Sequence, residues 1–150
     1  MDNLIKLKYQ KLTENAYDPV RGTPGSSGLD VFSPVDFTVP KRGDAMIPLD
    51  LRFEIPYGWD LAVYNKSGVA TKKKLSKGAE LIDSDYRGTV HIHFFNHSDE
   101  DILIEKGDKI SQLVMRPVWM GEIEESNSIS TETERGAGGF GSTGDKIKNN

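Results

Sequence analysis

The C-terminal segment Arg135–Gly144 carries residue types suited to binding a phosphorylated ligand. Its glycines expose backbone N–H groups and permit positive φ angles, and Arg135 can meet phosphate oxygens as a bidentate fork. Ser142 and Thr143 add hydroxyl groups, and Phe140 supplies one aromatic ring that can lie over a planar base. The segment therefore predicts a mobile arm that wraps around a phosphorylated ligand.

The alternative for this segment is a solvated, disordered tail, which Gly/Ser-rich termini often form. The arginine and the aromatic ring argue against that alternative. The spacing Gly136-x-Gly138-x-x-Gly141 satisfies the dinucleotide-binding pattern, but that fold needs a following helix and an acidic residue about 20 positions later. Only residues 145–150 follow, and Ser142 stands where a Walker loop requires lysine.

A second group of reactive side chains lies in residues 81–88, Leu81-Ile82-Asp83-Ser84-Asp85-Tyr86-Arg87-Gly88. An apolar pair entering a turn that has acidic residues at its start and glycine at its exit predicts a β-hairpin. Asp83 adjoins the apolar pair, so we expect its carboxylate to be partly desolvated and to act as a general base for water. The alternative is an ordinary solvated turn, since Asp and Gly are common turn residues.

Three shorter segments offer polar groups near the ends of predicted elements. In Lys66-Ser67-Gly68, the hydroxyl and the Gly68 amide can hold an anion at a helix start, although Ser67 can also be a plain N-cap. The turn before Asp30 brings this carboxylate to the mouth of a strand, where it orients a metal-bound water or caps the turn. Gln112 is opposite in parity to Leu113, so its amide faces a ligand or solvent.

Three histidines, His91, His93 and His97, share one parity on a predicted strand. An extended backbone puts all three on one face, which resembles a metal site. No carboxylate or cysteine shares the register, and the odd positions can equally face solvent or a partner subunit. We therefore assign these histidines no function.

Short strands are expected to position these segments. Apolar residues alternate or cluster in eight runs, 4–9, 29–32, 37–39, 46–55, 59–64, 90–95, 102–104 and 110–118. Turn residues separate the runs, and only residues 67–75 fit a short helix. This pattern predicts an all-β sandwich or barrel of jelly-roll type. We expect a core over residues 1–120, a polar linker over 121–134 and the glycine-rich arm over 135–150.

The composition describes one ordinary domain, with 150 residues, 36% hydrophobic and 28% charged. A net charge of −4 disfavours a duplex nucleic acid as a partner, and Lys72-Lys73-Lys74 is interpreted as a solvated loop. The absence of cysteine excludes disulfides, cysteine-ligated zinc and thiol nucleophiles. No signal peptide or run of ~20 apolar residues is evident, so we expect no membrane partner and a cytoplasmic location, or the host cytoplasm for a viral source.

Taken in order, five segments resemble the motifs of the trimeric deoxyuridine triphosphatases, the dUTPases. They are 27–30, 66–68, 78–88, 107–112 and 135–144. The third and fifth matches are highly specific, and together the motifs cover nearly the whole chain. The resemblance implies an all-β, distorted jelly-roll-like β-barrel subunit with one short helix and a flexible C-terminal arm. It also implies a homotrimer whose active sites lie between subunits, with the arm of one chain closing a site built by the others.

This resemblance implies a dUTP diphosphatase, which converts dUTP to dUMP and pyrophosphate, keeps uracil out of DNA and supplies dUMP for dTMP synthesis. Asp83 is then the base that activates water for attack on the α-phosphorus, and Tyr86 packs against the deoxyribose and excludes a 2′-hydroxyl. Mg²⁺ is held mainly by the phosphates and water, with Asp30 as an outer-shell partner. The hairpin that starts at Gly78 reads uracil through its backbone, and Phe140 stacks on the base. Further substrate contacts are implied at Lys66, Ser67, Gly68, Gln112, Arg135, Gly141, Ser142 and Thr143.

Three residues depart from the family pattern. Leu29 stands where tyrosine is usual, Lys66 where arginine is common, and Glu80 where glycine is common. The lysine keeps the charge but loses the guanidinium fork, so its phosphate contact is weaker or passes through water. A glutamate at position 80 puts the local hairpin backbone in question.

Two rival functions are compatible with this scaffold. One is dCTP deaminase, which releases ammonia, but the glycine-rich arm and the run Asp83-Ser84-Asp85-Tyr86 match the hydrolase pattern better. The other is a catalytically silent nucleotide sensor or interaction protein. The chain contains Asp83, Tyr86, Arg135 and Phe140, which argues against a catalytically silent protein. These residues do not exclude a second, binding role.

Overall fold

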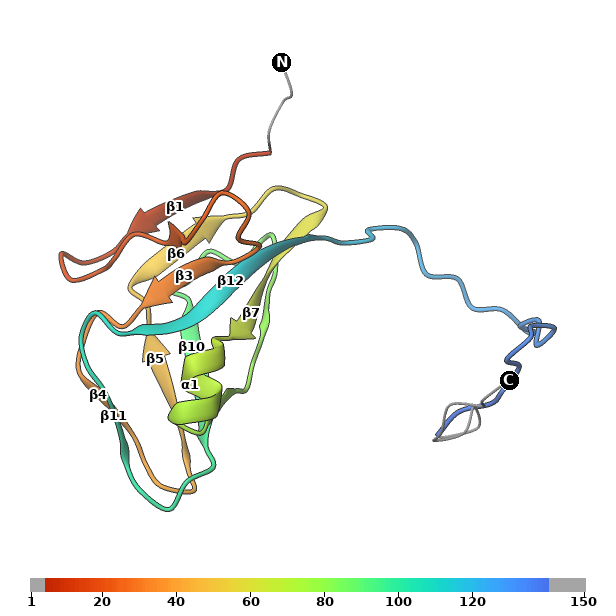
Figure 1. Cartoon of the computed structure of the whole chain (residues 1–150). Coiled ribbons are helices and arrows are strands. Elements are labelled where there is room, and N and C mark those ends of the chain that lie inside the picture. The colour runs from red at the N-terminus through yellow and green to blue at the C-terminus, as the bar shows by residue number, and fades with distance from the viewer. Residues whose placement is uncertain (1–4, 141–150) are drawn as a thin grey trace. The chain divides into compact units, whose positions relative to one another are not determined.

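The computed structural model describes residues 5–140. The chain divides into a compact unit that ends at Met120 and a second unit that begins at Gly121. Every strand and the helix lie in the first unit, and residues 121–140 contain neither (Figure 1).

Antiparallel strands make up almost all of the regular structure. In chain order, the elements are β1 (Lys8–Lys11), β2 (Val20–Arg21), β3 (Leu29–Phe32), β4 (Phe37–Val39), β5 (Asp44–Pro48), β6 (Leu51–Glu54), β7 (Trp59–Asn65), α1 (Ser67–Lys72), β8 (Leu75–Lys77), β9 (Leu81–Ile82), β10 (His91–Asn96), β11 (Ile102–Ile104) and β12 (Lys109–Pro117). The sheets have the orders β2-β3-β12-β7-β9, β5-β10-β8, β1-β6 and β11-β4. This arrangement confirms the prediction of an all-β fold with one short helix.

The predicted strand bounds are confirmed for some strands and wrong for others. The strands β3, β4 and β11 have the predicted bounds. The predicted run 46–55 is wrong as one strand, because Asp50 has a φ of 53° and the chain turns there between β5 and β6. The run 4–9 is also displaced, since the first strand is Lys8–Lys11 and its side chains are all exposed.

The helix is shorter than the predicted 67–75. It ends at Lys72, with Lys73 as its C-cap. Lys74 has a φ of 57°, which a continuing right-handed helix does not allow, and Leu75 already belongs to β8. The basic run is therefore divided between the helix end and a left-handed turn.

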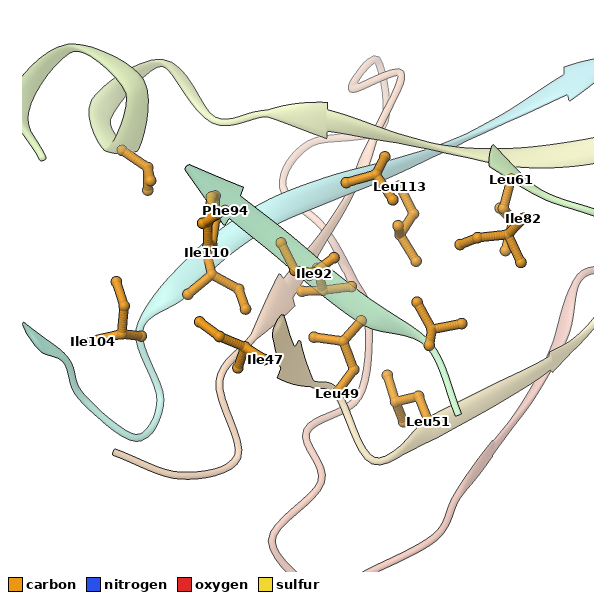
Figure 2. Packing of buried hydrophobic residues seen from close by; sticks show 14 of the residues in the cluster. Ile47, Leu49, Leu51, Leu61, Ile82, Ile92, Phe94, Ile104, Ile110 and Leu113 are labelled. Atoms are coloured by element: carbon orange, nitrogen blue, oxygen red, sulfur yellow. The ribbon is translucent and has the colours of Figure 1, made fainter. Parts of the chain in front are cut away.

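The core is built from side chains of strands that are far apart in the sequence. Ile47 of β5, Leu61 of β7, Phe94 of β10 and Leu113 of β12 are at most 1% exposed (Figure 2). Each such side chain contributes roughly 1.5–3 kcal/mol on burial. Ile82 of β9 joins the same cluster, so the hairpin that follows it is anchored to the core.

Candidate functional site

Asp30 is the most buried of those predicted site residues that the structure describes. It lies in β3 with 7% of its surface exposed. One carboxylate oxygen accepts a hydrogen bond from Lys66 Nζ at 2.6 Å, and the other lies 3.2 Å from Lys109 Nζ. Lys109 stands within the fourth motif, three positions before Gln112, but no pattern in the sequence distinguishes it as a partner of Asp30.

The two lysines decide the charge of this carboxyl group. Burial on its own raises the pKa of Asp30, but the hydrogen bonds and positive charges of Lys66 and Lys109 outweigh burial and hold the pKa below its ordinary value. Asp30 is therefore a stable carboxylate, and both of its oxygens are engaged by ammonium groups.

Gln112 lies on β12 beside this carboxylate. Its Cα pairs with those of Asp30 on β3 and Tyr64 on β7. Its amide donates to the Asn65 carbonyl oxygen at 3.1 Å, and its side chain packs closely on Gly28. A Cβ atom at position 28 would stand 3.1 Å from Gln112 Cβ and closer still to its amide oxygen. The glycine of the first motif therefore makes room for the glutamine of the fourth.

The segment 66–68 lines a basic pocket of about 320 Å³ at the start of α1. Besides Lys66, Ser67 and Gly68, Val69, Lys72, Lys73 and Lys109 contribute to its walls. Ser67 is the first helical residue and Lys66 is the N-cap, with no side-chain capping bond, so the interpretation of Ser67 as N-cap is wrong. Both Ser67 and Gly68 are exposed and accessible to a ligand.

The hairpin that carries Asp83 is tied at its turn. The Tyr86 N–H donates to the Asp83 carbonyl oxygen at 3.1 Å. The Arg87 guanidinium donates to the Ser84 and Tyr86 carbonyl oxygens at 2.7 and 3.0 Å. Because Ile82 is anchored in the core, these bonds hold the turn in a defined position at the edge of the sheet.

Asp83 lines two pockets. One, of about 480 Å³, is lined also by Trp59, Asp85 and Met120, and the other, of about 200 Å³, also by Tyr86. The expected partial desolvation is not found in the single chain, where Asp83 is exposed. The reason is that Leu81 points outward and is itself 57% exposed, whereas only Ile82 of the apolar pair is buried.

The base of the hairpin accepts Glu80 without backbone strain. Among residues 5–140, Glu80 is not one of those with positive φ. Its carbonyl oxygen accepts from the Val63 N–H at 2.8 Å, and its carboxylate pairs with Lys77. Gly78 packs under the ring of His93, where a Cβ atom would stand 2.6 Å from Cε1.

The three histidines each have a different partner. His93 Nε2 lies 2.9 Å from Asp44 Oδ2, His97 Nε2 lies 2.6 Å from Ser76 Oγ, and His91 Nδ1 lies 2.9 Å from the Thr89 carbonyl oxygen. Residues 5–140 contain no group of three His, Cys, Asp or Glu side chains placed to hold a metal ion. Within the described residues, the three histidines therefore do not converge on one site.

The second unit shows the first half of the predicted arm. Arg135 Nε donates to the Gly138 carbonyl oxygen at 2.8 Å, and Gly136 has a φ of 53°. Phe140 is fully exposed. The predicted contacts at Gly141, Ser142 and Thr143 lie outside the described residues.

Asp83 and the segment 66–68 lie beside opposite ends of strand β7. Ile82 pairs with Leu61, so Asp83 is level with Asp60 on β7, whereas Ser111 of β12 pairs with Asn65. At about 3.3 Å per residue, the five steps between Asp60 and Asn65 span about 16 Å. Ser67 and Gly68 come after that end of β7, so one chain does not bring them to the Asp83 carboxylate.

No helix among residues 5–140 combines the length and apolar character needed to cross a bilayer.

Comparisons with known proteins agree on one family. The dUTPase family model matches residues 14–144. The deoxyuridine 5'-triphosphate nucleotidohydrolase of Arabidopsis thaliana is 45% identical over 91% of this chain and 82% of the relative. That of Fowl adenovirus A serotype 1 is 42% identical over 93% of this chain and 78% of the relative. Relatives from Dictyostelium discoideum and Homo sapiens are named mitochondrial, so a cytoplasmic location for this chain stays a prediction.

Solved structures extend the likeness to the fold. The dUTPase of Staphylococcus bacteriophage 80alpha, solved with dUPNHPP, has a TM-score of 0.85 and 29% identity over 93% of this chain and 99% of the phage chain. A mutant dUTPase from phage phi11 of S. aureus, solved to reveal the coordination of a structural Mg(II) ion, has a TM-score of 0.76 and 26% identity. That match covers 82% of this chain and 97% of the phage chain.

Proposed function

The chain belongs to the dUTPase family and hydrolyses dUTP, and we propose that Asp83 activates the water that attacks the α-phosphorus. The observation that carries this proposal is the place of Asp83, fixed in a tied turn that lines two pockets and next to Tyr86. The family match confirms the prediction of a dUTP diphosphatase.

The proposed reaction uses one carboxylate and one water. The water oxygen forms a bond to the α-phosphorus while the Asp83 carboxylate takes its proton. The bond from the α-phosphorus to the oxygen that bridges to the β-phosphorus breaks, and that oxygen leaves with pyrophosphate. Asp83 is exposed in the single chain, so substrate and a neighbouring subunit must exclude bulk water to strengthen it as a base.

We propose further that each active site is shared between subunits of a homotrimer. Adjacent phosphorus atoms of a triphosphate are joined through a single oxygen, so residues that bind them must lie close to one another. The span of about 16 Å along β7 separates Asp83 from Asn65 and the basic pocket beyond it. Asp83 of one copy and the basic pocket of another can meet around one substrate, whereas those of a single chain cannot.

The basic pocket is the proposed seat of the β- and γ-phosphates. Ser67 offers a hydroxyl, Gly68 a backbone N–H, and Lys66 a positive charge. Gln112 adds an amide from the neighbouring strand. In this proposal the arm brings Arg135 to the same phosphates and Phe140 to the base, together with Gly141, Ser142 and Thr143.

Magnesium fits these residues as an ion held by the substrate. Asp30 is one buried carboxylate whose oxygens already contact two lysines, and residues 5–140 form no cage of several acidic ligands. Mg²⁺ prefers to keep several waters and to bind through phosphates and one or two carboxylates. When bound, it would neutralise charge on the triphosphate, with Asp30 facing its water shell.

The pocket of about 200 Å³ beside Asp83 is the proposed nucleoside site. Ile82, Tyr86 and Val90 give it apolar walls, and Asp83 lies at its edge. In this proposal the backbone of the hairpin from Gly78 reads the uracil edge and crowds the methyl group of thymine. Tyr86 packs against the deoxyribose and leaves no space for a 2′-hydroxyl.

The direct test is an assay with four nucleotides. The purified chain is incubated with Mg²⁺ and dUTP, dCTP, dTTP or UTP, and pyrophosphate and ammonia are measured. Pyrophosphate from dUTP alone is the expected result, and chelation of Mg²⁺ should lower its rate. Ammonia from dCTP would favour the deaminase, and binding of dUTP without turnover would favour a nucleotide sensor.

A further inference from the structure

Tyr86 rests on a residue that has no side chain. A Cβ atom added to Gly88 would stand 2.6 Å from Tyr86 Cζ and 3.0 Å from Cε2, and closer still to the hydroxyl oxygen. The same hydroxyl donates a hydrogen bond to the Thr89 carbonyl oxygen at 3.0 Å. Gly88 and the Thr89 carbonyl together form what we call the Tyr86 seat.

The seat requires glycine for space and not for backbone conformation. Gly88 is not among the glycines with positive φ in residues 5–140, so alanine can adopt the same backbone. Tyr86 is 45% exposed, and the atoms in conflict are at the far end of its side chain. A methyl group at position 88 would therefore displace the tyrosine ring and leave the chain in place.

Gly88, the part of the seat under the ring, lies outside the pocket that the ring helps to form. Tyr86 lines the pocket of about 200 Å³ together with Asp83 and Val90, whereas Gly88 does not line it. A substitution at Gly88 thus reaches the nucleoside only through Tyr86.

We propose that Gly88 and the Thr89 carbonyl are a specificity-determining device, which fixes the Tyr86 ring as the wall that rejects a 2′-hydroxyl. The inference rests on the proposed role of Tyr86 at the deoxyribose. Gly88 is a positioning residue in this proposal, because it touches the tyrosine and not the substrate. A wall discriminates against one added oxygen only if it cannot move aside by an ångström or more.

The test is Gly88→Ala, assayed with dUTP and UTP. We expect the ratio of kcat/KM for dUTP to kcat/KM for UTP to fall by about tenfold or more, since the wall is no longer fixed. The melting temperature should change little, because the displaced ring is already half-exposed. Gly25→Ala is the matched control, since a Cβ atom there meets nothing within 4 Å and both activity and ratio should be retained.

A second variant keeps the inference testable if Gly88→Ala does not fold. Tyr86→Phe retains the ring over Gly88 but removes the hydrogen bond to the Thr89 carbonyl oxygen, so the ratio should fall by a smaller factor. In the double variant, the two effects should not add, because both act through the position of one ring.

The outcomes separate this inference from the proposed function. An unchanged dUTP-to-UTP ratio in both single variants would overturn the role of the seat. An equal loss on the two substrates, or the same loss in Gly25→Ala, would overturn it as well. A wild-type chain that fails to hydrolyse dUTP would instead overturn the proposed function itself.

Discussion

Asp83 differs from Asp85, its neighbour in the same turn, in lining both pockets beside the hairpin. We expect Asp83→Asn to lower kcat by about 10² to 10⁴ while dUTP still binds, because the amide keeps the shape but cannot take a proton from water. Steady-state kinetics give kcat, and calorimetry with a non-hydrolysable dUTP analogue gives the affinity.

The matched control is Asp85→Asn, which removes the same charge two residues away. Asp85 lines only the larger pocket, and we expect it to retain most of the turnover. Near-normal turnover of Asp83→Asn, or an equal loss in both variants, would remove Asp83 from the role of base.

Asp30 and its two lysines make stability depend on pH in a predictable direction. The folded pKa of Asp30 lies below the ordinary value of 3.8, so its contribution is present above that pH and is lost as the pH falls through the folded pKa. We expect Asp30→Asn to lower the free energy of unfolding by about 1–3 kcal/mol at pH 7. The difference between variant and wild type should shrink at pH 3, as measured by urea unfolding at one protein concentration.

An exposed ion pair supplies the comparison for this effect. Asp99 also pairs with a cation, Arg42, at 2.7 Å, but its side chain is 82% exposed. Solvent screens such a pair, so Asp99→Asn should change the stability little at either pH. A pH-independent loss in Asp30→Asn would show that its lysine contacts are not what the carboxylate contributes.

The end of α1 contains an avoidable conflict between sequence and backbone. Lys74 follows the C-cap with a φ of 57°, where a side chain is strained and glycine is not. Lys74→Gly should therefore raise the free energy of unfolding by about 0.5–1 kcal/mol, and thermal unfolding measures it. Ala70→Gly, inside the helix, should have the opposite sign, and a loss at both positions would contradict the argument.

The strands that sequence predicted are those whose apolar residues stand between recognisable turn residues. Strands β3, β4 and β11 were placed by apolar runs between clear turns, and β7, β10 and β12 within one residue. Strand β2 was missed because two residues carry no detectable alternation, and β8 because Leu75 was placed at the end of the predicted helix. Strand β9 was expected only as the apolar entry to the hairpin of residues 81–88. The break at Asp50 was missed because aspartate is only one of several residues that adopt a left-handed turn.

Some residues of the candidate site could be chosen from motif order in the sequence, whereas others are found only from side-chain contacts in the structure. Motif order selected Asp30, Lys66, Asp83 and Gln112 as candidates without a structure. The second lysine on Asp30 and the packing of Gly88 under Tyr86 depend on side-chain positions, which no spacing in the sequence encodes. The partial desolvation expected of Asp83 is not found in the single chain, because Leu81 beside it in sequence is itself exposed.

The glycine-rich arm has too few apolar side chains to stabilise the first unit by burying them. We therefore expect the arm to contribute to the turnover of dUTP and not to the stability of the core. A chain truncated before Arg135 should lose dUTP hydrolysis and keep the oligomer of the full chain, because the core cluster belongs to residues before 121. Light scattering gives the mass and the pyrophosphate assay gives the activity. Dissociation of the truncated chain into monomers would show that the arm is structural.

A shared active site makes a prediction that a site within one chain does not. Asp83→Asn lacks the base, and the chain truncated before Arg135 lacks the arm, so each should be inactive alone. If the base and the arm of one site come from different copies, a site is intact only when its base comes from a truncated chain and its arm from an Asp83→Asn chain. Co-refolding equal amounts of the two variants meets each condition half the time, so about one quarter of the sites have an intact base and an intact arm. Activity should therefore return to about a quarter of wild type. If base and arm served one site from a single chain, every site would lack one or the other, and mixing would restore nothing.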